Sequence, residues 1–128
     1  MILNPNSMKP IYVQIAEYLE GEILNDAIHP DEKIYSQYQL AEMFNINPAT
    51  AAKGLNMLAD EEIVYKRRGL GMFVAKNAKG IILTKRTNTK LKELIEETVK
   101  EASQLGISED ELMTMIQQAV KQLKGEEA

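Results

Sequence analysis

The sequence predicts a mainly α-helical protein with one small β-hairpin, an α+β chain in two parts. Three observations carry this prediction. Helix-forming segments fill most of residues 10–60, two short apolar strands flank a glycine-rich turn near residue 69, and two amphipathic stripes follow residue 88. We expect one domain over residues 1–76, and a linker followed by two helices over residues 77–128.

Composition excludes several classes of protein. The chain of 128 residues has a net charge of −4, no Cys and a single His29, so disulfides, thiolate metal sites and a His cluster within one chain are excluded. No nucleophile or acid–base constellation emerges, so we expect no catalytic residue, no metal and no cofactor. The N-terminus lacks signal-peptide features and no apolar run approaches a membrane span. These features predict a cytoplasmic protein without a membrane partner.

Two helices open the chain. Ile11, Ile15, Leu19 and Ile23 recur every fourth residue and predict an amphipathic helix over residues 10–25. A loop containing His29 and Pro30 follows. Ser36 and Gln39 have the spacing of a capping box, which predicts the start of a second, short helix. That helix buries Leu40, Ala41 and Phe44 and ends near Asn45, a residue type that tolerates a left-handed conformation.

The third helix raises a question about its surroundings. In the segment INPATAAKGLNML, Asn47 can cap the helix and Pro48 suits its first position. Leu55 and Leu58, with Ile46, give it a buried side. Its exposed side is small and weakly charged: Asn47, Ala49, Thr50 and Lys53. Two short helices joined by a tight turn form a helix-turn-helix, whose second helix enters the major groove of DNA. A surface helix packed on another protein would show the same pattern, and this segment alone favours neither.

A basic hairpin follows the third helix. Residues 63–65 and 72–74 read as two strands, joined by the turn RRGLG. Residues 63–90 carry eight basic and no acidic side chains, whereas residues 17–32 carry six acidic and no basic ones. The chain therefore has a basic side despite its acidic total. Helices and hairpin in this order predict a winged helix, with the hairpin placed along the DNA backbone or minor groove.

The motifs resemble one family of bacterial regulators. The runs PIYVQIAEYLEGEIL and IYSQYQLAEMFNINPATAAKGLNMLADEEIVYKRRGLGMFV are similar to the DNA-binding domain of the GntR family. The NPAT variant and the short tail look most like its YtrA subfamily, in which two C-terminal helices dimerise. The resemblance implies a homodimeric transcriptional regulator, a repressor, that binds an inverted-repeat operator in double-stranded DNA. It also suggests control of its own operon and of adjacent transporter genes.

Residue by residue, the resemblance and the helical pattern together give a set of DNA-binding candidates. They are Ser36, Gln37, Tyr38, Asn47, Ala49, Thr50, Lys53, Lys66, Arg67, Arg68, Gly69 and Gly71. The sequence departs from the family where Tyr38 stands at a position that is often Arg, and where Pro48 and Ala52 replace arginines of the third helix. The wing arginines must therefore carry more of the cationic contact. Glu62 stands where glycine often ends the third helix, which predicts a left-handed Glu62.

The C-terminal part predicts a pair of amphipathic helices. Residues 76–87 are expected to link, with a bend at Gly80 and an apolar patch at residues 81–83 that packs on the first helix or on a partner. One helix runs from Asn88 to Leu105, and the next begins at Ser108 with a second capping-box spacing. The predicted dimerisation stripe is Leu91, Leu94, Ile95, Val99, Leu112, Met115, Ile116, Val120 and Leu123. Alternatively, the two C-terminal helices pack against the winged helix of the same chain.

Two further interpretations concern partners. The acidic total is also compatible with a winged-helix module that binds proteins and no specific DNA. Large C-terminal domains of GntR relatives bind metabolites, so an unidentified small-molecule effector is a second expectation. Tyr12, Met113 and Met115 are candidates to line its site, although methionines at helical spacing are more often core residues.

Overall fold

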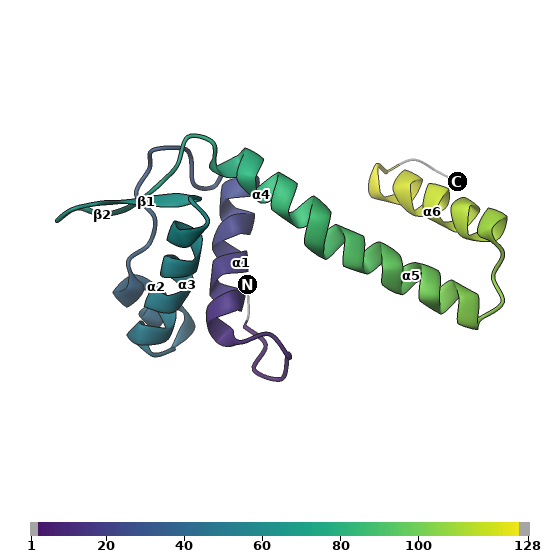
Figure 1. Cartoon of the computed structure of the whole chain (residues 1–128), viewed down its shortest axis with the longest axis horizontal. Helices are drawn as coiled ribbons and strands as arrows, with labels where there is room; N and C mark the ends of the chain where they lie inside the picture. The colour runs from purple at the N-terminus through teal and green to yellow at the C-terminus, as the bar shows by residue number, and fades with distance from the viewer. Residues whose placement is uncertain (1–2, 126–128) are drawn as a thin grey trace. The chain divides into compact units, whose positions relative to one another are not determined.

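The computed structural model describes residues 3–125 (Figure 1). The chain divides into two compact units, Met1–Lys85 and Arg86–Ala128. The first unit holds α1 (Ile11–Leu24), α2 (Gln37–Phe44), α3 (Pro48–Asp60), β1 (Val64–Arg67) and β2 (Gly71–Val74). Next come α4 (Ala78–Arg86), a π-helical turn η1 (Thr87–Leu91), α5 (Lys92–Gln104) and α6 (Glu109–Leu123). The order and type of the predicted elements are confirmed as far as residue 74.

The core of the first unit is built by the predicted stripes. α3 packs against both α1 and α2 (Figure 1). Ile15, Leu19, Leu40 and Leu58 are fully buried in one cluster, and Ala51 joins them from α3. Gly54 is needed at this contact because an added Cβ would lie 2.8 Å from the Tyr12 carbonyl oxygen. Because α1 packs closely against one side of α3, the opposite side of α3 faces solvent.

Local signals account for the helix ends. Ser36 Oγ accepts a hydrogen bond from the Gln39 N–H (3.1 Å), and Gln39 Oε1 accepts from the Ser36 N–H (2.8 Å), which confirms the capping box. Asn45 ends α2 in the left-handed region at φ 54°. Glu62, after α3, has φ 63°, as predicted from its place in the chain. Phe44 is only partly buried and meets Tyr18 edge-on, with ring centroids 5.1 Å apart.

The hairpin is antiparallel, with Val64 paired to Val74 and Arg67 to Gly71. Lys33 forms an isolated bridge to Phe73 on the other side of β2. Side chains alternate across a strand, so Lys66 and Met72 share one face of the hairpin, while Tyr65, Arg67 and Phe73 share the other. The loop before α2 thus supports the wing, which the local sequence pattern did not predict.

The expected linker is instead a helix. Residues 78–86 form α4, and Gly80 lies inside it without a bend. The prediction was wrong because Ile82 is fully buried in the core of the first unit, and burial of an apolar side chain outweighs the weak helix propensity of glycine. Ile81 packs partly against the same core, whereas Leu83 is exposed. The backbone then continues through η1, where a helix had been expected to begin at Asn88.

The second unit is a helical pair with its apolar stripes exposed. α5 ends before Gly106, which is left-handed at φ 69°, and Gly125 follows α6 at φ 77°. Ser108 Oγ accepts from the Glu111 N–H (3.1 Å), but its hydroxyl also donates to Glu111 Oε1, so only half of the second capping box forms. Ala102 is the one buried residue within α5 and α6.

Candidate nucleic-acid interface

The exposed face of α3 lies opposite its contact with α1. Asn47 Oδ1 accepts from the Ala49 N–H (2.8 Å), so the predicted cap is confirmed and its amide NH2 remains available to donate. Ala49 and Lys53 are exposed, whereas Thr50 is half-buried on the flank of the helix. The other backbone N–H groups of the first turn point along the helix axis, as in helix N-termini that bind phosphate.

Helical spacing adds two residues to this face. Ala52 and Asn56 follow Ala49 at three and seven residues, which places all three on one side of α3. Ala52 is half-buried and Asn56 exposed. Asn56 was not among the predicted site residues, although the i, i+3, i+4, i+7 spacing from Ala49 would have indicated it. A side-chain amide at this place could pair with an adenine edge.

Lys53 is less free than its position predicts. Its Nζ lies 4.3 Å from the centroid of the Tyr12 ring, in a cation–π contact between α3 and α1. Such a contact at an exposed site is worth only about 0.5–1 kcal/mol. Lys53 can therefore leave the ring for a phosphate at small cost, but it starts on the α1 side of α3.

The start of α2 contributes a polar cluster. Ser36 is occupied by its reciprocal capping bonds, so its side chain serves mainly to fix the helix end. Gln37 is half-buried beside it, and Tyr38 is 69% exposed. Tyr38 thus presents a hydroxyl and a ring to solvent at the place where an arginine was expected from the family pattern.

The two wing arginines differ in how they are held. The Arg67 guanidinium carbon lies 4.6 Å from the centroid of the Phe73 ring, and its Nη2 donates to the Tyr65 hydroxyl (3.3 Å). That hydroxyl donates in turn to Asp31 Oδ1 (2.8 Å). Arg67 is therefore held in place on the face of the hairpin that it shares with Tyr65 and Phe73. Arg68, at the tip, is exposed and forms no ion pair with any residue in the range 3–125.

Lys33 adds a cation that sequence patterns did not single out. A Cβ added to Gly71 would lie 2.8 Å from Lys33 Cε, so the lysine side chain crosses directly over this glycine. Gly71 also has φ 110°, which other residues avoid, so both the turn and the lysine require glycine here. No spacing rule connects Lys33 with the wing, because only the tertiary fold brings the loop before α2 to β2.

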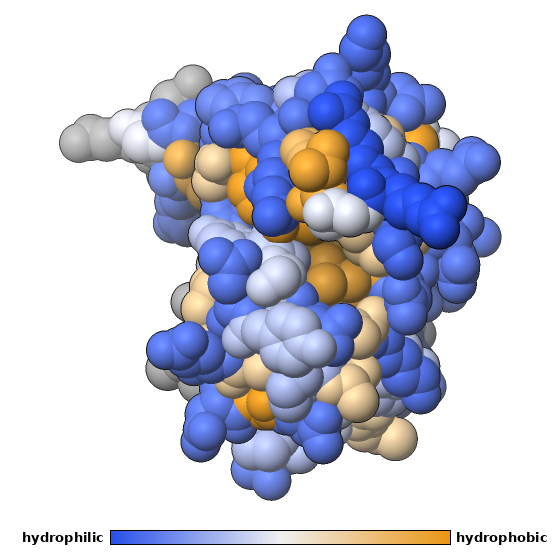
Figure 2. All heavy atoms as spheres, turned by 90° about the vertical axis from the view of Figure 1, so that its left-hand side faces the viewer, coloured by the Kyte–Doolittle hydropathy of each residue, from blue (hydrophilic) through white to orange (hydrophobic). Residues whose placement is uncertain are grey.

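A cleft joins three elements of the first unit. Its walls are the start of α2, the exposed side of α3 and the inner face of the hairpin; the lining residues are Tyr35, Ser36, Gln37, Tyr38, Ala52, Leu55, Asn56, Lys66, Gly71 and Met72. Five of the predicted DNA-binding residues meet here: Ser36, Gln37, Tyr38, Lys66 and Gly71. Asn47, Ala49, Thr50, Lys53, Arg67, Arg68 and Gly69 lie outside the cleft lining. Figure 2, viewed from the hairpin side, shows a mostly hydrophilic surface with small apolar patches.

The acidic side of the first unit is partly neutralised. Lys9 pairs with Glu17 (2.8 Å) and Lys79 pairs with Asp26 (3.0 Å). Neither Lys66 nor Arg68 has such an acidic partner within the described part of the chain. The negative total charge therefore does not cancel the local positive charge of the wing.

Other kinds of site find no support in residues 3–125. No group of three or more His, Cys, Asp or Glu side chains is placed to hold a metal ion there. In the same part of the chain, no helix combines the length and apolar character needed to cross a membrane.

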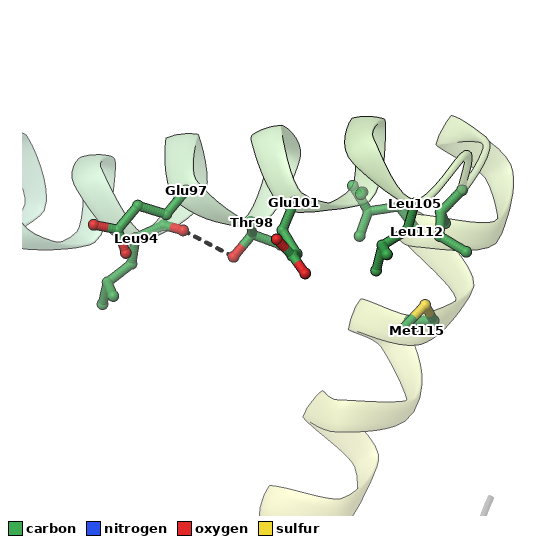
Figure 3. Close-up of a pocket in the computed structure, with 9 residues that line it drawn as sticks. Leu94, Glu97, Thr98, Glu101, Leu105, Leu112 and Met115 are labelled. Carbon is green, nitrogen blue, oxygen red and sulfur yellow. Dashed lines mark hydrogen bonds between the residues drawn. The ribbon is translucent and has the colours of Figure 1, made fainter.

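The predicted dimerisation stripe lies on the surface of the second unit. Eight of its nine residues are exposed and Leu112 is half-buried: Leu91, Leu94, Ile95, Val99, Met115, Ile116, Val120 and Leu123. A groove between α5 and α6 is lined by Leu94, Glu97, Thr98, Glu101, Ala102, Leu105, Ile107, Leu112 and Met115. In Figure 3 the labelled side chains of both helices project into the space between them. These side chains form an apolar surface that is not covered within the second unit.

The sequence profile of the gntR family of bacterial regulatory proteins matches residues 11–74. The repressor YtrA of Bacillus subtilis is 28% identical over 96% of this chain and 94% of its own length. The repressor NagR of the same organism is 38% identical over 59% of this chain, but the match spans only 31% of NagR.

Solved structures show the same architecture. A GntR-family regulator from Bacteroides thetaiotaomicron has a TM-score of 0.74 at 30% identity, over 89% of this chain and 99% of that one. The DNA-binding domain of AraR, in complex with operator ORX1, has a TM-score of 0.53 at 31% identity, over 59% of this chain and 93% of that one. The predicted fold class, a winged helix-turn-helix followed by C-terminal helices, is confirmed.

Proposed function

Because the chain belongs to the GntR family of bacterial regulatory proteins, we propose that it binds an inverted-repeat operator in double-stranded DNA as a homodimer and represses transcription. The names of YtrA and NagR as repressors, and the operator complex of the AraR domain, support this proposal. The matched residues 11–74 contain the cleft and the whole wing.

One observation carries the proposal most directly: Ala52 and Asn56 of α3 line the same cleft as Lys66 of the hairpin. Ala49 and Ala52 let the helix backbone approach base edges, and Asn56 supplies a donor and an acceptor. Lys66 lines the cleft, while Arg68 extends from the hairpin tip. We propose that α3 reads bases and that the wing and the start of α2 contact phosphates.

The proposed division of labour follows the two units of the structure. The first unit, which includes α4 through the buried Ile82, carries DNA binding, and the second unit, Arg86–Ala128, carries dimerisation. A two-fold dimer would present two α3 helices to two half-sites about one helical turn apart. The exposed stripes of α5 and α6 support this assignment because neither is covered within the second unit. An unidentified effector stays a prediction; Met115 lines the groove between α5 and α6, where such a molecule would reach it.

Binding to DNA is tested by fluorescence anisotropy with the duplex upstream of the gene and a scrambled duplex of equal length, across a salt series. We expect preference for the upstream duplex and a steep loss of affinity with salt, because bound phosphates release counterions. The double variant Arg67→Ala/Arg68→Ala should weaken binding to both duplexes, and each lost phosphate contact should reduce the salt slope by roughly 0.9.

A variant of α3 and a matched control test whether the Asn56 side chain contributes to sequence preference. Asn56→Ala should reduce preference for the upstream duplex by about 1–3 kcal/mol if the amide contacts a base. Gln104→Ala truncates an exposed side chain of α5 and should leave the affinities for the upstream and the scrambled duplex unchanged. Salt-insensitive binding in the native chain would argue for a protein-binding module instead.

A further inference from the structure

The charges of α5 are distributed unevenly along its length. Lys90 lies in η1 directly before the helix and Lys92 begins it, whereas Glu93, Glu96, Glu97 and Glu101 follow. One Lys100 interrupts the acidic part. None of these side chains forms an ion pair within residues 3–125. The helix therefore has a basic beginning and an acidic continuation, both without internal neutralisation.

The same charges fall on two flanks of the apolar stripe. Glu97 and Glu101 are one turn apart and line the groove beside Leu94, and Lys90 precedes Glu97 by about two turns on that side. Lys92 and Glu96, again one turn apart, lie on the opposite flank. Each flank thus carries positive charge first and negative charge after it.

The exposed part of the stripe marks where another helix would lie. Leu91, Leu94, Ile95 and Val99 are all about half-exposed, whereas Ala102, near the end of α5, is buried. The midpoint of these four residues falls between Leu94 and Ile95. A two-fold symmetry axis at that point places Lys90 of one copy beside residue 99 of the other copy. Residue 99 lies two residues from both Glu97 and Glu101, which is about 3 Å along the helix.

We propose that a second copy of this chain packs its α5 antiparallel across α5, with Lys90 against Glu97 and Glu101 of the second copy and Lys92 against its Glu96. This rests on the proposed homodimer and not on DNA binding. Antiparallel helices bring like flanks together, so both flanks become charge-complementary to themselves. A parallel, in-register pair would instead face Lys90 with Lys92 and Glu97 with Glu96, which is repulsive on both sides.

Sedimentation equilibrium of the full chain tests the arrangement. Lys90→Glu should weaken the dimer about tenfold, because each of two symmetric attractions becomes a repulsion. Glu97→Lys/Glu101→Lys should weaken it similarly, and the triple variant that combines these changes should return to the native dissociation constant. Lys100→Glu, a reversal on the side of α5 away from the stripe, is the matched control and should have little effect.

Mixing the two weakened variants gives a second readout. Labelled Lys90→Glu and Glu97→Lys/Glu101→Lys chains should form heterodimers in preference to either homodimer, as measured by energy transfer. Lys90→Glu that dimerises as tightly as the native chain, or more tightly, would overturn the antiparallel pairing, and the tighter case would indicate a parallel pair. A native chain that stays monomeric at all concentrations would overturn the proposed homodimer itself.

Discussion

The two units of this chain treat their apolar residues in opposite ways. The first unit, Met1–Lys85, buries a continuous cluster that runs from Ile15 to Ile82. Among its described residues, the second unit, Arg86–Ala128, buries Ala102 and leaves most of its large aliphatic side chains exposed. Amphipathic stripes in the sequence predicted helices in both units. The difference shows that an amphipathic stripe specifies a buried face but does not specify what buries it.

The first unit completes its core because its helices meet at several angles and close around each other. Two helices alone form a single layer, and one side of each stripe must remain open. The stability of the first unit should therefore be a property of one chain. The stability of the second unit should depend on association and hence on protein concentration.

The largest expected effect compares one buried and one exposed leucine. Leu58→Ala removes a side chain with no solvent exposure and should lower the free energy of unfolding by about 3 kcal/mol, through lost transfer energy and the cavity left behind. Leu94→Ala removes a side chain that is 49% exposed and should change the unfolding of the dilute chain little. Urea titrations at two protein concentrations measure both.

The same titrations can break the comparison. Leu94→Ala should make the concentration dependence of unfolding weaker, whereas Leu58→Ala should shift the midpoint equally at both concentrations. A native chain with no concentration dependence would mean that the second unit is stable alone, and that its exposed stripe has another purpose.

The next effect concerns the last turn of α4. Lys85 Nζ donates to Glu20, whose side chain is 1% exposed, and pairs with Glu61 (2.9 Å), so α4 is tied to α1 and to the end of α3. Lys85→Met keeps the aliphatic stem but removes a cation that pairs with the buried Glu20 carboxylate. We expect a loss of about 2 kcal/mol, less than for a fully buried pair because Lys85 retains some solvent contact.

The pH dependence of this contact has a definite sign. Burial lowers the pKa of Lys85, but the hydrogen bonds to Glu20 and Glu61 outweigh it, so the pKa is raised above the ordinary 10.5. A raised pKa in the folded state means that the stabilisation is fully present below pH 10.5 and is lost as the pH rises through the folded value. Chemical unfolding at pH 9 and pH 11 should therefore show a smaller difference for Lys85→Met than for the native chain.

Much of the first unit follows from local sequence signals. The capping box at Ser36, the Asn47 cap, the left-handed Asn45 and the two strands are set within a few residues, and each was predicted correctly. Contacts distant in sequence were not predictable in this way. Lys33 reaches Gly71 across the fold. Ile82 turns an expected linker into α4 because the core of the first unit receives it.

The candidate DNA-binding site shows the same division. Helical spacing gave the small face of α3 and the turn signal gave the wing cations. Which of them are held and which are free depends on partners from other elements. Arg67 is fixed by Phe73 and Tyr65, and Lys53 is drawn toward Tyr12, and no local pattern encodes either contact.

The smallest predicted effect concerns left-handed residues, where the two units also differ. The first unit places Asp26, Asp31, Asn45 and Glu62 at positive φ, whereas the two such positions described in the second unit are Gly106 and Gly125. A well-packed core can hold a few residues in this unfavourable region, at about 1 kcal/mol each. A two-helix unit without a closed core has less stability to offset that cost.

Replacing the left-handed Glu62 by glycine and the left-handed Gly106 by alanine should change stability in opposite directions. Glu62→Gly should stabilise the first unit by about 0.5–1 kcal/mol, because relief of the left-handed strain exceeds the entropy that glycine adds to the unfolded chain. Gly106→Ala should destabilise the second unit by about 1 kcal/mol, and since no atom lies within 4 Å of the added Cβ, the effect would be conformational and not steric. Urea unfolding reads the first change, and the dimer dissociation constant reads the second. If Glu62→Gly gave no gain, then Glu62 would make a compensating interaction in solution, and the core would not be what holds it at positive φ.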